Sequence, residues 1–228
     1  MNTTSSLQHF FLDRLRRVGL ALLGLIIFGF GMYMQLRSDV GLSPWQAFNE
    51  GLTLHFPISF GTASILVSVL VVVADVLLRE PIGVGTILDA LVVGWSIDFF
   101  LWLDPLPMMP GAVASVCLLL CSIAVMALSQ YIYMKAALSC GPRDALLVAL
   151  GRKFPKTPIG AVNTGLLVII LVIAFFLGGS IGLGTVINMA FTGPIMQLVF
   201  HLLHFEPRDV THEGLADTLS AFRAACGR

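Results

Sequence analysis

The sequence predicts an all-α polytopic membrane protein in which six transmembrane helices form two inverted repeats of three helices. Three observations lead to this fold class. The 228 residues are 57% hydrophobic and only 11% charged, whereas a soluble domain carries roughly 25% charged residues. Six apolar runs reach the length of about 20 residues that a helix needs to cross a bilayer. One glycine-rich phrase also occurs twice along the chain.

The six apolar runs are separated by charged residues and by turn residues such as glycine and proline. Such breaks are typical of the loops between membrane helices. Six crossings return the chain to the side on which it began, so we expect both termini on one side. The expected spans cover residues 17–36, 60–78, 83–103, 111–136, 158–178 and 182–204.

The first span follows a basic segment, residues 1–16. Arginines before an apolar run are typical of a signal peptide, which ends at a small-residue cleavage site. This run instead continues to about Leu36 without such a site. We therefore predict a retained membrane helix, preceded by an amphipathic cytoplasmic segment at 1–16.

The basic residues indicate the orientation, because lysine and arginine concentrate in cytoplasmic loops. With a cytoplasmic N-terminus, only Arg37 of the 13 basic residues falls outside. The opposite orientation would reverse this bias. We therefore expect both termini in the cytoplasm, with the tail at 205–228 forming an amphipathic helix on the inner leaflet.

The repeated phrase is PIGVGTILDALVVG at 81–94 and SIGLGTVINMAFTG at 180–193, 99 positions later. GLSPWQAF at 41–48 matches SCGPRDAL at 139–146 in the same order, at an offset of 98. The ordered recurrence of proline, Gly-x-Gly-Thr and glycine predicts two copies of one unit. The expected units are repeat 1 at 17–103 and repeat 2 at 111–204, joined by an external linker at 104–110.

Each predicted repeat contains three full spans, so the second repeat enters the membrane from the opposite side. Each also contains one segment too short to cross. In repeat 1, Ser43 is a good N-cap and Pro44 a good first residue for a short helix at 44–55. The matching helix is expected at 142–151. Both an interfacial placement in the headgroup layer and a re-entrant placement stay open. We favour re-entry, because short broken segments at matching positions of inverted repeats are typical of transport sites.

The candidate site residues lie at the starts of the third and sixth spans and of the short helices. Helix N-terminal amides beside a threonine hydroxyl can hold an anion or a carbonyl group. Small residues at the same positions can also serve close helix packing, and both roles stay open. The predicted substrate-binding residues are Gly85, Thr86, Asp89, Gly184, Thr185, Asn188, Trp45, Arg143 and Asp144.

Asp89 is a carboxylate inside a predicted membrane span, where such a group is costly and usually faces a cavity or a partner. It follows Thr86 by one helical turn, and its counterpart in repeat 2 is Asn188. Binding of a cation, uptake of a proton and a structural hydrogen bond all stay open. Arg143 opens the second short helix, where it either attracts anions or serves as one more cytoplasmic basic residue.

The sequence offers no pattern for other chemistries. The four cysteines have no spacing that suggests a zinc site or a disulfide framework, and we find no hydrolase motif. The net charge of zero gives no reason to expect a nucleic-acid partner. We therefore expect no cofactor, no metal ion and no enzymatic activity.

The stretches GLSPWQAF, PIGVGTILDALVVGWSID, CGPRDALLVAL and GGSIGLGTVINMAFTGPIMQ resemble the YczE/YitT group of bacterial integral membrane proteins, and YczE more closely. The resemblance covers the chain from about Arg17 to His204. It implies a multi-pass protein of the bacterial inner (plasma) membrane, and it implies no particular activity.

Two functions follow from these features. The first is a small secondary transporter or permease for a small polar or anionic solute, with proton coupling through Asp89 as one option. The second is a non-transporting scaffold or accessory protein for a partner enzyme, in which the repeat reflects ancestry alone. The expected partners are the lipid bilayer and a small-molecule solute, and a homodimer or a membrane partner protein stays open.

Overall fold

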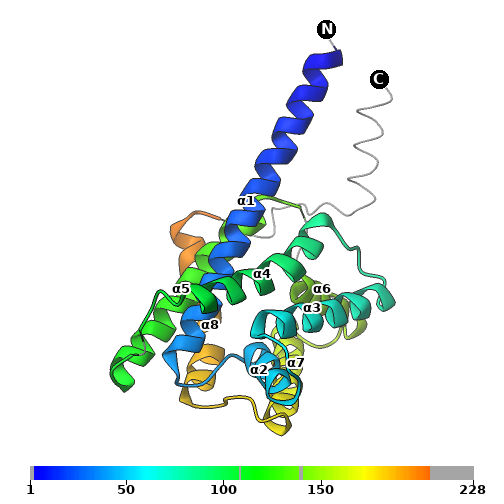
Figure 1. Cartoon of the computed structure of the whole chain (residues 1–228). Coiled ribbons are helices and arrows are strands. Elements are labelled where there is room, and N and C mark those ends of the chain that lie inside the picture. Colours follow the sequence, from blue (N-terminus) through cyan, green and yellow to red (C-terminus); the bar gives the residue numbers. More distant parts are fainter. Residues whose placement is uncertain (1–2, 108, 139–140, 206–228) are drawn as a thin grey trace.

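The computed structural model describes residues 3–107, 109–138 and 141–205, and these residues form eight helices and no strand (Figure 1). The all-helical prediction is confirmed. The predicted amphipathic tail lies outside the described residues from 206 onward. The helices are α1 Thr3–Ser38, α2 Pro44–His55, α3 Phe60–Leu77, α4 Val84–Leu103, α5 Ala112–Lys135, α6 Pro142–Lys153, α7 Ile159–Phe176 and α8 Leu183–Leu202.

All of these helices except α2 and α6 are long and apolar enough to cross a membrane, which confirms the predicted number of six spans. α1 is one continuous helix that includes the segment expected to precede the first span, and its N-terminal part extends beyond the other helices (Figure 1). α3 shows how the spans meet lipid, because its exposed apolar residues recur at helical spacing. They are Leu66, Leu70, Val73 and Leu77.

α1 and α5 pack along each other at the centre of the structure. α4 packs on α1, and α8 packs on α5. α3 packs on α6, and α7 packs on α2. The core between α1, α4 and α5 is built from buried side chains that include Leu25, Met32, Ile97 and Tyr133.

Helices at corresponding positions in the two halves have equal lengths. α2 and α6 each have 12 residues, α3 and α7 each have 18, and α4 and α8 each have 20. Their ends are also built alike. The Gly83 N–H donates to Thr86 Oγ1 at 3.3 Å, and the Gly182 N–H donates to Thr185 Oγ1 at 3.2 Å.

The halves differ in how their last two helices meet. α3 and α4 touch at two glycines, where a methyl group on Gly94 would lie 2.5 Å from the carbonyl oxygen of Gly61. Asp98 completes this contact by accepting from Ser59 Oγ at 2.6 Å and from the Gly61 N–H at 2.8 Å. The corresponding glycines of α7 and α8, Gly160 and Gly193, would each offer open space to a methyl group. α7 and α8 therefore lack the close contact that joins α3 to α4.

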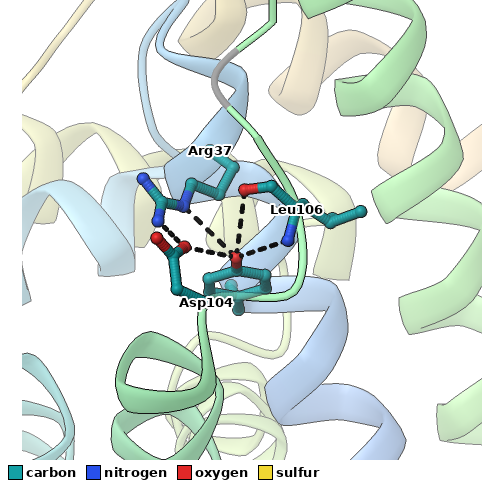
Figure 2. A network of polar contacts seen from close by, with 4 residues as sticks. Arg37, Asp104 and Leu106 are labelled. Atoms are coloured by element: carbon teal, nitrogen blue, oxygen red, sulfur yellow. Dashed lines mark hydrogen bonds and ion pairs between the residues drawn. The ribbon is translucent and has the colours of Figure 1, made fainter.

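A polar network fixes the linker after α4 to the end of α1 (Figure 2). The buried Tyr33 hydroxyl donates to Asp104 Oδ1 at 2.9 Å and accepts from Arg37 Nε at 3.2 Å and the Leu106 N–H at 3.1 Å. Arg37 also forms an ion pair with Asp104. The one basic residue expected outside the cytoplasm is therefore paired with an acidic partner.

Tyr33→Phe is expected to lower the free energy of unfolding by about 1–2 kcal/mol, because hydrogen bonds to charged groups are each worth about 1.5–3 kcal/mol and Asp104 is partly exposed. Tyr131→Phe is the matched control, since among the described residues the Tyr131 hydroxyl accepts only from the exposed Lys135, at 3.2 Å. Denaturation of the detergent-solubilised variants measures both changes. Equal losses in the two variants would contradict a structural role for the network.

Candidate functional site

The structure contains a cavity of about 110 Å³ between α1, α3, α4, α5 and the start of α6. Its apolar wall comes mainly from α1, with Leu25 and Phe28. Its other walls carry polar and charged side chains, which is unusual inside an apolar helix bundle. These are Ser68, Asp89, Ser129, Gln130, Tyr133, Arg143 and Asp144.

Asp89 enters the cavity from α4, about 8 Å from the start of that helix at 1.5 Å per residue. Its carboxylate lies close above Gly141, where a methyl group would come within 3.2 Å of Asp89 Oδ2. Glycine at this position therefore leaves room for the carboxylate. Within the described part of the chain, Asp89 has no hydrogen-bond donor or ion-pair partner.

Arg143 and Asp144 enter the cavity from the first turn of α6. Gly141 is the N-cap of this helix and Pro142 its first residue, so the local sequence fixes where the helix begins. The Arg143 guanidinium carbon lies 5.0 Å from the ring centroid of Trp45, the second residue of α2. This is a cation–π contact, which holds the guanidinium in place without using its N–H donors.

Burial raises the pKa of the Asp144 carboxyl and lowers the pKa of the Arg143 guanidinium, because each charged form loses hydration. The attraction between these two opposite charges opposes both shifts. Asp144 has one polar neighbour, since Gln130 Nε2 donates to Asp144 Oδ2 at a long 3.4 Å. Arg143 forms no ion pair with either aspartate among the described residues.

The cavity thus brings together three of the nine residues expected from the sequence, with Trp45 beside them as a fourth. The other five do not line it. Gly85 and Thr86 are buried at the start of α4. Asn188 is buried in α8 and accepts from the Thr192 hydroxyl at 3.3 Å.

Gly184 and Thr185 hold the loop between α1 and α2 in place. The Gly184 N–H donates to the Val40 carbonyl at 2.6 Å. Gly41 has a φ of +111°, which favours glycine, and its backbone lies against Gly182 and Thr185. This close backbone approach gives the Gly-x-Gly-Thr phrase of the second half a packing role.

Four polar residues of the cavity were not among the nine predicted substrate-binding residues: Ser68, Ser129, Gln130 and Tyr133. A signal for three of them existed, because Ser68, Ser129 and Gln130 are polar residues within apolar spans. No cluster of three or more histidine, cysteine or acidic side chains suited to a metal ion occurs in the described ranges.

The fold and the cavity define a polytopic membrane protein of six apolar helices with a charged interior pocket. A family model described as a family of unknown function (DUF6198) matches residues 15–201, and the chain belongs to this family. The resemblance to the YczE group is confirmed by the relatives. No solved structure matches the chain.

Two relatives illustrate this similarity. The chain is 31% identical over 176 residues to the uncharacterized membrane protein YczE of Bacillus subtilis (strain 168), covering 76% of this chain and 80% of that protein. It is 26% identical over 190 residues to an uncharacterized protein of Haemophilus influenzae (strain ATCC 51907 / DSM 11121 / KW20 / Rd), covering 82% and 85%. YczE supports a multi-pass membrane location for this chain.

Proposed function

We propose that the protein is a small secondary transporter that carries a small polar solute across the bacterial inner membrane through the charged cavity. The observation that carries this proposal is the meeting of the two short helices beside the cavity, where Arg143 of α6 stacks on Trp45 of α2. Half-helices that meet near the midplane of a repeat interface are the usual setting of a transport site.

The contact between the short helices supports a re-entrant placement for them. With a cytoplasmic N-terminus, α2 follows the first crossing and enters from outside, whereas α6 follows the fourth crossing and enters from inside. The hydrocarbon layer is about 30 Å thick. Two helices in opposite headgroup layers could not bring side chains within 5.0 Å of each other. The contact therefore supports a placement in which at least one of the two, and by symmetry both, dips into the membrane.

The inverted repeat is supported by contacts that recur in both halves. Trp45 and Arg143 are themselves counterparts at an offset of 98, so their contact lies on the expected pseudo-two-fold axis. Near the end of α1, Arg37 donates to the Tyr33 hydroxyl, and near the end of α5, Lys135 donates to the Tyr131 hydroxyl. The distribution of basic residues supports cytoplasmic termini.

The difference between the halves supports a cytoplasm-open state. Asp98 lies about 21 Å along α4 at 1.5 Å per residue, so its contact with α3 closes the outer half in the proposed orientation. The counterpart glycines of α7 and α8 lie apart in the inner half. Inverted-repeat transporters alternate access by rocking one repeat against the other. The other state would close α7 on α8 and part α3 from α4.

Flux into liposomes tests the proposal. The purified full chain is reconstituted and supplied with radiolabelled amino acids, carboxylic acids and amines of small size, with protein-free liposomes as the control. We expect uptake of at least one solute class that saturates with concentration. Saturable binding of a solute without any flux would contradict transport and would favour the scaffold alternative.

A further inference from the structure

We infer that the solute is a small zwitterion, with an ammonium group that pairs with Asp89 and an acidic group that pairs with Arg143. The inference rests on the proposed function and assigns the class of substrate. It is carried by two opposite charges that face one cavity and form no ion pair with each other or with another described side chain.

Unpaired charges inside a membrane protein are costly, and a buried charge that lacks its partner destabilises the protein strongly. Asp89 and Arg143 are close enough to attract each other, yet they form no ion pair. The guanidinium instead lies against the ring of Trp45. A solute that carries both charges can occupy the space between them and satisfy both.

Solutes with a single charge fit this site less well. An anion could pair with Arg143, but it would face the carboxylates of Asp89 and Asp144. A cation could pair with Asp89, but it would leave Arg143 unpaired and would face its positive charge. Asp144 already accepts from Gln130 at Oδ2, whereas Asp89 has no donor among the described residues, so Asp89 is the carboxylate with more free hydrogen-bonding capacity.

The size of the cavity limits the solute to a small molecule. Its volume of about 110 Å³, counted as space open to the centres of water molecules, holds several waters, because one water needs about 10–15 Å³ of such volume. Glycine and β-alanine are therefore suitable probes. Acetate and methylammonium are close in size to glycine and each keep one of its two charges, so the four compounds separate charge from size.

Binding to the purified full chain in detergent, by calorimetry and by thermal shift, tests the inference. We expect glycine or β-alanine to bind at least tenfold more tightly than both acetate and methylammonium. Asp89→Asn should remove the preference for the zwitterion over acetate, and Arg143→Gln should remove its preference over methylammonium. Asp13→Asn, at an exposed residue paired with Arg17, should change neither preference.

The inference is wrong if a single-charge compound binds within threefold of the better zwitterion, or if neither zwitterion binds. Size-exclusion profiles of the variants show whether a lost preference is due to misfolding. A changed preference between two solutes also requires a folded site, whereas a loss of affinity for all solutes does not. If a zwitterion binds but is not transported, the assigned site is correct and the proposed transport function is wrong. If a purely anionic solute shows saturable flux, the proposed transport function is correct and the inferred substrate class is wrong.

Discussion

Asp89→Asn is expected to reduce solute uptake into liposomes by about 100-fold or more while leaving the protein folded. Asparagine keeps the shape of the side chain but removes the charge that faces the cavity. Losing one partner of a buried charge pair costs about 3–5 kcal/mol, and every 1.4 kcal/mol is a tenfold change in affinity. Initial uptake rates across a range of solute concentrations measure the loss.

Two further variants show whether the charge itself is responsible. Asp89→Glu keeps the charge and should retain part of the uptake, although its extra methylene crowds the carboxylate against Gly141. Asn188→Ala changes the counterpart position in α8, which lies outside the cavity, and should leave solute affinity close to that of the original protein. Full uptake in Asp89→Asn would show that the carboxylate has a structural role at the helix interface.

Local sequence features predict the helices well because each helix end is decided by its own residues. Pro44 and Pro142 each occupy the first position of a short helix, as expected from their fixed φ. Each apolar run is long enough to cross the hydrocarbon layer, so the preference of apolar side chains for lipid explains every span. The first helix begins well before the predicted span at 17–36, because nothing in residues 3–16 interrupts the helical backbone.

The candidate site could be predicted only in part, because its residues come from different helices of both halves. Asp89 stands out as a charge in an apolar run, and Arg143 as a charge in a short helix. Their meeting depends on how α6 packs beside α4 and α1, which no local pattern specifies. The sequence predicted that both Gly-x-Gly-Thr phrases would contribute to the site. Neither phrase lines the cavity, and Thr185 packs on the loop at Gly41.

The polar residues within the membrane spans were hard to rank as site candidates, because their hydrogen-bond partners also depend on the neighbouring helices. Serine in a membrane helix often bonds to its own backbone, as Ser129 does when it donates to the Met126 carbonyl at 2.7 Å. The side chain of Gln130, one residue further, reaches Asp144 instead. Sequence alone cannot separate these two outcomes, because the neighbouring helix decides which partner is available.

Leucine at the two counterpart glycines of α4 and α8 should give opposite results, and the contrast tests the proposed conformational change. Gly94→Leu places a side chain where even a methyl group would lie 2.5 Å from the Gly61 carbonyl oxygen. Overpacking of this kind typically costs about 1–3 kcal/mol, and here the obstacle includes the backbone carbonyl of Gly61 beside the Ile65 side chain. We expect a marked loss of thermal stability in detergent.

Gly193→Leu should leave thermal stability nearly unchanged, because a side chain at this position meets open space. It should nevertheless abolish uptake, since α7 could no longer close on α8 when access alternates. Solute binding in detergent should persist, because the cavity lies between other helices. Stability measured by thermal denaturation and uptake measured in liposomes therefore separate the two glycines. Normal uptake by Gly193→Leu would mean that α7 and α8 stay apart during the whole transport cycle. The hypothesis that α7 closes on α8 while α3 parts from α4 would then be wrong.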